Sequence, residues 1–108
     1  MPDLTGLPGA EKVERGVRDL NAGRVTVESL LVAMAPTRLR ELGLAIGEGV
    51  DLPENPEIEL YHLLGRTQND AYYRYNALRR ELDSFLAALQ SRKGRAANSR
   101  RKGALARG

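Results

Sequence analysis

Cysteine and tryptophan are absent from this sequence of 108 residues, which has one histidine and one phenylalanine. Without cysteine there is no disulfide framework and no thiolate to bind a metal, and one imidazole does not make a cluster of nitrogen ligands. We therefore expect no metal site and no cofactor. No apolar run is long enough to span a membrane, and the first residues lack the basic start and the apolar stretch of a secretory signal. These absences predict a cytoplasmic protein without a membrane partner.

Charge is divided unevenly along the chain. Residues 1–91 contain all 14 acidic residues and 10 of the 17 basic ones, a net charge of −4, whereas residues 92–108 contain the other seven basic residues and no acidic one. Small and polar residues separate these charges, so we expect a flexible basic tail that contacts the phosphates of RNA or DNA, or that is only a solvated end. The candidate nucleic-acid-binding residues are Arg92, Lys93, Arg95, Arg100, Arg101, Lys102 and Arg107.

The longest periodic pattern covers residues 67–91, which include no Gly or Pro. Apolar side chains recur three or four residues apart, as on one face of a helix, at Ala71, Tyr75, Leu78, Leu82, Phe85 and Leu89. A helix of this length spans roughly 36 Å, longer than the other segments can form. We expect Thr67 and Asp70 to begin it as a variant capping box.

Shorter helical patterns precede it. Residues 10–22 are amphipathic and end before Gly23, and residues 27–34 follow Thr26, a good N-cap, and are apolar nearly all round, which predicts a buried helix. Thr37 is expected to cap residues 38–42 before Gly43, and Asn55-Pro56 to begin a helix that ends at Gly65. Gly16 either marks a close helix contact or is tolerated at some cost.

These patterns predict an all-α fold, because no run of alternating residues is long enough to indicate a strand. We expect a compact bundle of four or five helices around a long C-terminal helix, with a disordered basic tail. The predicted organisation is a flexible N-terminus at residues 1–9, a helical domain at 10–91 and the tail at 92–108.

The long helix also suggests self-association. Leu86 and Ala88 broaden its apolar stripe, so an exposed part is predicted to pair with a second copy or another protein, unless the first two helices cover it. The candidate interface residues are Leu82, Phe85, Leu86 and Leu89.

Three other clusters have both a functional and a structural interpretation. His62 is the one imidazole, but no Ser, Cys or second His accompanies it at a fixed spacing, which favours a surface residue over an acid or base. Tyr72, Tyr73 and Tyr75 surround Arg74, a composition that can stack on unpaired bases, although core and rim packing is the stronger interpretation.

The third cluster is Arg38 and Arg40, which follow Pro36-Thr37 in the position of a recognition helix. The short helix and the acidic body argue against that role. The sequence as a whole predicts a small non-enzymatic interaction module, whose body binds a protein or itself and whose tail contacts nucleic acid. The alternatives are a regulator that reads DNA or RNA sequence, and a small enzyme or enzyme subunit that uses His62.

Overall fold

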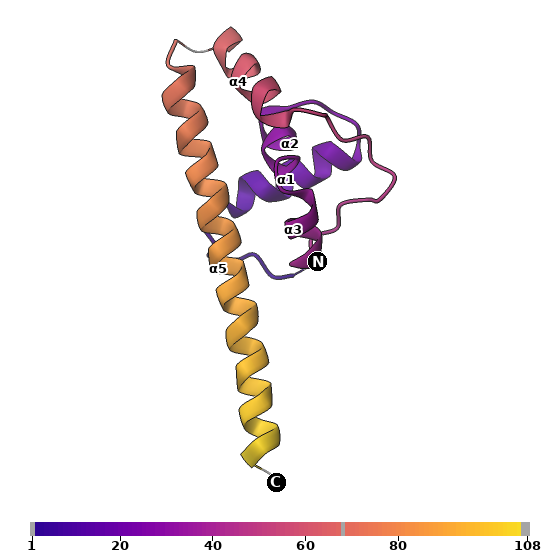
Figure 1. Cartoon of the computed structure of the whole chain (residues 1–108), viewed down its shortest axis with the longest axis vertical. Coiled ribbons are helices and arrows are strands. Elements are labelled where there is room, and N and C mark those ends of the chain that lie inside the picture. Colours follow the sequence, from indigo (N-terminus) through magenta and orange to yellow (C-terminus); the bar gives the residue numbers. More distant parts are fainter. Residues whose placement is uncertain (1, 68, 107–108) are drawn as a thin grey trace.

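Five helices make up the fold (Figure 1). The computed structural model describes residues 2–67 and 69–106, and the side chains of residues 2–66 and 69–94. Within these residues every regular element is a helix, which confirms the predicted all-α fold. The elements are α1 (Ala10–Asn21), α2 (Val27–Val32), α3 (Pro36–Glu41), α4 (Pro56–Thr67) and α5 (Ala71–Ala106).

The long C-terminal helix α5 is the spine of the molecule, and α1 to α4 lie along its first half (Figure 1). Its predicted apolar stripe faces the core, where Phe85 is fully buried and Leu78, Leu82, Leu86 and Leu89 are at most 4% exposed. The helix continues beyond residue 91, where we expected it to end and a tail to begin. The flexibility of residues 92–108 stays a prediction.

Helix α2 is buried, as its composition predicts, but its main neighbour is α1, with smaller contacts to α4 and α5. Gly16 allows α1 and α2 to approach each other closely. A β-carbon at Gly16 would lie 2.5 Å from Cγ2 of Val32 and would overlap the carbonyl group of Glu28. Of the two interpretations of Gly16, the structure therefore supports the close helix contact.

Two of the three predicted glycine helix endings are confirmed, at Gly23 and Gly43. Gly23 and Gly43 have φ of 75° and 96°, in the left-handed region that favours glycine. After α3, the amide of Gly43 donates to the carbonyl oxygen of Arg40, and that of Leu44 to the carbonyl oxygen of Leu39, both at 3.0 Å. This is a Schellman ending, and Leu44 is buried beside it.

Several predicted helix boundaries are wrong, and the end of α2 lies at Val32 instead of residue 34. Helix α3 begins at Pro36, one residue before the expected cap Thr37, because proline suits the first helical position. Helix α4 passes through Gly65 and ends at Thr67, since a glycine without positive φ does not terminate a helix. Helix α5 begins at Ala71 and not directly after Thr67. Asp70 immediately precedes it, and the carbonyl oxygen of Asp70 accepts a hydrogen bond from the amide of Arg74.

The N-terminal segment packs against the body instead of fraying. Leu4 is only 3% exposed and belongs to the core, and Leu7 packs against it. Arg92 of α5 fastens this segment, because its guanidinium donates hydrogen bonds to the carbonyl oxygens of Asp3 and Thr5, each at 2.9 Å. The flexibility of residues 1–9 stays a prediction, and the sequence did not indicate the burial of Leu4 or the hydrogen bonds from Arg92.

Candidate apolar groove

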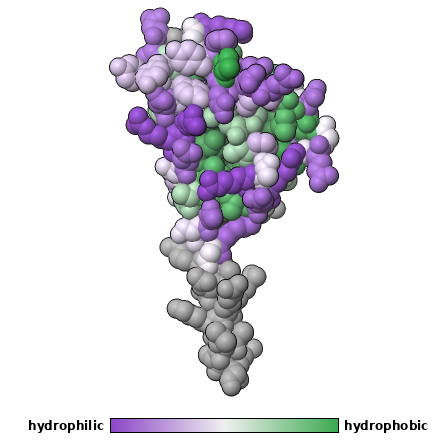
Figure 2. Space-filling model, viewed as in Figure 1, coloured by the Kyte–Doolittle hydropathy of each residue, from purple (hydrophilic) through white to green (hydrophobic). Residues whose placement is uncertain are grey.

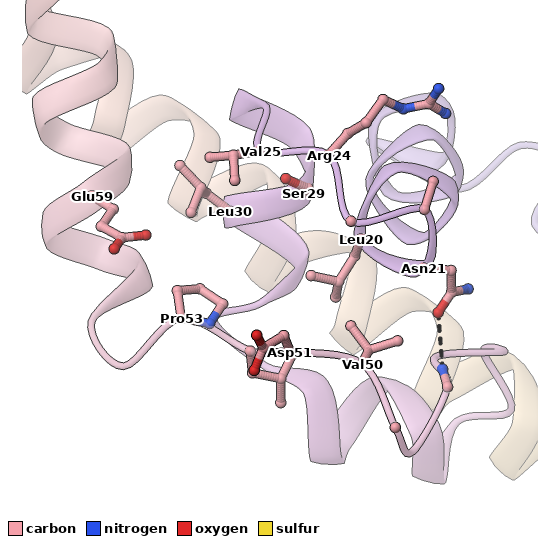
Figure 3. A pocket seen from close by; sticks show the side chains of 15 residues that line it. Leu20, Asn21, Arg24, Val25, Ser29, Leu30, Val50, Asp51, Pro53 and Glu59 are labelled. Atoms are coloured by element: carbon pink, nitrogen blue, oxygen red, sulfur yellow. Dashed lines mark hydrogen bonds between the residues drawn. The ribbon is translucent and has the colours of Figure 1, made fainter.

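An open groove of about 1030 Å³ lies between the turn that joins α1 to α2, the loop after α3 and the first turns of α4 (Figure 3). Residues 20–25, Ser29 and Leu30 form one side, and Gly47 and residues 49–53 form the opposite side. Glu59 of α4 closes one end. The groove is thus built from three segments that are far apart in the sequence.

Asp19 is buried, and its carboxylate fixes the turn between α1 and α2 by accepting two hydrogen bonds. Its Oδ2 accepts a hydrogen bond from the hydroxyl of Thr26 at 2.8 Å, and its Oδ1 accepts one from Nε of Arg24 at 3.2 Å. The Thr26 hydroxyl also accepts from the amide of Ser29 at 3.1 Å, while the Ser29 hydroxyl oxygen accepts from the amide of Thr26 at 2.8 Å. This reciprocal capping box holds the first wall of the groove in place.

Asn21 and Arg40 fix the opposite wall. The Asn21 side chain accepts a hydrogen bond from the amide of Gly47 at 2.9 Å and donates one to the carbonyl oxygen of Ala45 at 2.8 Å (Figure 3). Arg40 donates to the carbonyl oxygens of Ile46 and Gly47 at 3.1 and 2.8 Å. Because side chains from α1 and α3 hold the loop, both walls are defined before any partner binds.

Apolar and polar side chains share the lining of the groove, and some of the apolar ones are open to solvent. Val25 is 73% exposed and Leu52 is 37% exposed, and both line it. Leu20 and Leu30 are buried at its floor, and Val50 is half-buried. On the face shown in Figure 2, hydrophobic side chains gather within the helical body and hydrophilic ones surround them. Exposed apolar area rimmed by polar side chains is typical of an interaction site.

The charge near the groove is acidic on the side of the loop and α4. Residues 47–59 contain five carboxylates, at Glu48, Asp51, Glu54, Glu57 and Glu59, and no basic residue. Asp51 and Glu59 line the groove itself. Arg24 does little to neutralise these carboxylates, since its guanidinium is paired with Asp19 and points away from Val50 and Pro53 (Figure 3).

His62 lies beside this groove, in a smaller hollow of about 280 Å³ that shares Val25, Leu30 and Glu59 with it. The imidazole is exposed, and Arg66 is the other basic side chain there. In the part of the chain that the structure describes, no three His, Cys, Asp or Glu residues are grouped to hold a metal ion. Within the same residues, no helix combines the length and apolar character needed to cross a membrane.

The four residues of the predicted protein interface lie in the core of this structure. Leu82, Phe85, Leu86 and Leu89 are at most 4% exposed, because α1 to α3 and the N-terminal segment cover this face of α5. A second copy would have to displace the core to reach them. Of the two possibilities that the sequence leaves open, the structure supports coverage within one chain.

Six of the seven predicted nucleic-acid-binding residues lie in the C-terminal part of α5, and Arg107 lies outside the described residues. Arg92 is half-buried and its guanidinium is engaged with Asp3 and Thr5, whereas Lys93 is exposed. The other five predicted residues lie outside the described side chains: Arg95, Arg100, Arg101, Lys102 and Arg107.

The candidate recognition residues Arg38 and Arg40 are both engaged within the chain. Arg38 donates to Oε1 of Gln90 at 2.8 Å, and Arg40 holds the loop after α3. Neither guanidinium is presented for base reading, and α3 has only six residues. The structure therefore offers no support for sequence reading by this helix.

The sequence did not reveal the groove, because its walls come from residues 20–30, 47–53 and 59. One signal was present: Val25 and Leu52 are apolar residues in segments without helical periodicity, where burial is not enforced. Comparisons with protein-family models, with curated proteins and with solved structures gave no match to this chain.

Proposed function

We propose that this chain is a small non-enzymatic interaction module. Its acidic helical body binds a segment of a partner protein in the groove between the α1–α2 turn, the loop after α3 and α4. Its basic C-terminal part contacts the phosphates of RNA or DNA. Such an adaptor would bring the partner protein to nucleic acid, in agreement with the expected cytoplasmic location.

The observation that supports the protein-binding part is the apolar lining of the groove. Val25 and Leu52 expose apolar area that folding leaves uncovered, and the groove walls are already fixed by the side chains of Asp19, Asn21 and Arg40. A preformed site loses little conformational freedom on binding. The carboxylates of Asp51 and Glu59 favour a segment that combines apolar side chains with Lys or Arg.

The nucleic-acid part is supported by the division of charge. Residues 92–108 contain seven basic residues and no acidic one, while the preceding 91 residues have a net charge of −4. The body repels a polyanion and the terminal part attracts it, so contact should be confined to that part. The alternatives of sequence reading and of catalysis by His62 remain predictions that no contact described above favours.

A peptide selection tests the protein-binding part. A random peptide library should yield binders rich in apolar and basic residues when it is selected on the intact protein. Val25→Glu combined with Leu52→Glu places two carboxylates in the lining and should weaken these peptides at least tenfold. Both side chains are exposed, so the melting temperature should change little.

Ile58→Glu is the matched control. Ile58 is an exposed apolar residue of α4, 54% exposed, and it does not line the groove. This variant should bind the selected peptides like the parent protein. Peptides that bind all three proteins equally, or a selection without enrichment, would contradict the proposed site.

A further inference from the structure

Tyr61 lies in α4, and Tyr72, Tyr73 and Tyr75 lie in the first turns of α5, so all four tyrosines of the chain belong to the two helices that meet at one end of the molecule (Figure 1). The rings of Tyr61 and Tyr75 meet edge to face with centroids 6.1 Å apart, and those of Tyr72 and Tyr73 meet in the same way at 5.8 Å. Tyr72 and Tyr75 are three residues apart on α5 and so share one face of the helix. The four rings thus form two edge-to-face pairs near the start of α5, and we call the four side chains together the tyrosine row.

The tyrosine row is a surface feature and not part of the core. Tyr73 is 75% exposed, Tyr72 62% and Tyr61 42%, and only Tyr75 packs against the core. The sequence interpretation had placed Tyr72 at the edge of the buried stripe, so the structure moves it outward. Three aromatic rings that the fold leaves exposed, at Tyr61, Tyr72 and Tyr73, need another explanation than packing.

The charge around the tyrosine row is opposite to that of the rest of the body. Residues 61–80 contain four arginines and one acidic residue, Asp70, a net charge of +3 within a body of −4. Arg79 belongs to the row directly, because its Nη1 lies 3.4 Å from the hydroxyl oxygen of Tyr75. Arg80, seven residues after Tyr73, lies on the same side of α5 as that ring and is exposed.

We propose that the tyrosine row is a binding surface for single-stranded nucleic acid, on which unpaired bases stack while Arg79 and Arg80 contact the phosphates. Exposed aromatic rings with interleaved arginines supply both interactions. A duplex cannot use the row, since its bases are already stacked and paired. The surface thus distinguishes unpaired from paired strands without reading sequence.

A protein partner is the competing occupant, because Tyr and Arg are also common at the centres of protein interfaces. Charge favours the polyanion, since residues 61–80 have a net charge of +3 within a body whose net charge is −4. In the turn before α5 and along its first residues, the side chains next to the row are polar or small, at Asn69, Asp70, Asn76 and Ala77; on α4, exposed Ile58 lies three residues before Tyr61. The inference shares its partner class with the proposed function but depends on other residues than the basic C-terminal part.

Tyrosine fluorescence gives a direct test. The chain has no tryptophan and all four tyrosines belong to the row, so its intrinsic emission reports this surface alone. Titration of the full chain with a single-stranded thymidine oligonucleotide should quench the emission saturably, and the same strand in a duplex should not. Tyr72→Ala combined with Tyr73→Ala should weaken single-strand affinity about tenfold or more, whereas the corresponding Phe variant should keep it.

A tail variant separates this inference from the proposed function. Arg100, Arg101 and Lys102 replaced together by Ala should weaken duplex binding and leave the quenching by single strands in place. Quenching that disappears in the tail variant but persists when Tyr72 and Tyr73 are replaced would overturn the inference and leave the tail assignment standing. Absence of quenching, with equal retention of single and double strands, would also overturn it, and would leave the row to a protein partner.

Discussion

Gly16 of α1 is in direct contact with Val32 of α2: a β-carbon at Gly16 would lie 2.5 Å from Cγ2 of Val32. The nearby carbonyl group of Glu28 is backbone and cannot rotate away, so Gly16→Ala forces α1 and α2 apart. Overpacking of this kind outweighs the gain of about 1 kcal/mol from alanine's helix propensity. We expect a loss of about 2 kcal/mol in unfolding free energy, or roughly 8–16 °C in melting temperature.

Gly65→Ala is the control for this prediction. Gly65 also lies within a helix, and a β-carbon there would meet no atom within 4 Å. The variant should gain about 0.5–1 kcal/mol in urea unfolding because only helix propensity changes. If both alanine variants are stabilised, the close approach of α1 and α2 is wrong.

Arg92→Ala should loosen the N-terminal segment. It removes the two hydrogen bonds from the guanidinium to the carbonyl oxygens of Asp3 and Thr5, and Leu4 depends on this anchor for its place in the core. We expect a loss of about 1 kcal/mol in unfolding free energy. Amide hydrogen exchange should accelerate in residues 4–10. Lys93→Ala removes the same charge one residue later and should change neither quantity; equal effects of the two variants would disprove the anchor.

Asp3 should contribute a small acid-sensitive part of the stability. The Thr5 hydroxyl donates a hydrogen bond to the Asp3 carboxylate at 2.7 Å, and the Thr5 amide donates another at 3.0 Å. These bonds, with the Arg92 charge as the weakest cause, lower the pKa of Asp3 below the ordinary 3.8. Because the pKa of Asp3 is lower in the folded state, its carboxylate contributes fully to stability above pH 3.8. This contribution is lost as the pH falls through the pKa of the folded state.

Urea unfolding between pH 2 and 7 measures this contribution. The stability difference between the parent protein and Asp3→Asn should be constant above about pH 5 and should shrink as the solution becomes more acidic. A difference that grows with acidity would contradict the assignment.

The capping box at Thr26 gives a further stability prediction. Thr26→Ala removes the acceptor for the Ser29 amide and leaves Oδ2 of the buried Asp19 without its hydroxyl donor. We expect a loss of about 2 kcal/mol in unfolding free energy, at the upper end for an N-cap. The same variant should weaken the selected groove peptides, because the α1–α2 turn forms one wall. Urea unfolding and peptide titration check the two effects; unchanged stability would contradict the network.

Local signals in the sequence predicted most of the helices correctly. The spacing of Leu78, Leu82, Phe85 and Leu89 identified the buried face of α5, because helical periodicity depends only on neighbours along the chain. The helix endings at Gly23 and Gly43 were predicted from equally local signals. The ending predicted at Gly65 was wrong, since a glycine ends a helix only when its φ becomes positive, and its sequence neighbours did not determine that φ.

The other differences between the sequence predictions and the structure concern contacts between distant segments. The stripe of α5 was assigned to a second copy because periodicity does not show how much of it α1 to α3 and Leu4 cover. Arg92 was assigned to the tail by its neighbours in sequence, whereas its partners Asp3 and Thr5 are almost the whole chain away. The groove and the tyrosine row likewise depend on which helices lie together, and composition alone does not contain that information.

The salt dependence of duplex DNA binding tests the charge division on which the account depends. Since the guanidinium of Arg92 is engaged, six basic residues of the C-terminal part remain, and the log–log slope should be no steeper than about −5. Replacement of Arg100, Arg101 and Lys102 by Ala should reduce that slope by roughly 2–3. The account would be contradicted if duplex DNA showed no salt-sensitive retention of the full-length protein at low ionic strength. It would also be contradicted if the triple replacement left the slope unchanged.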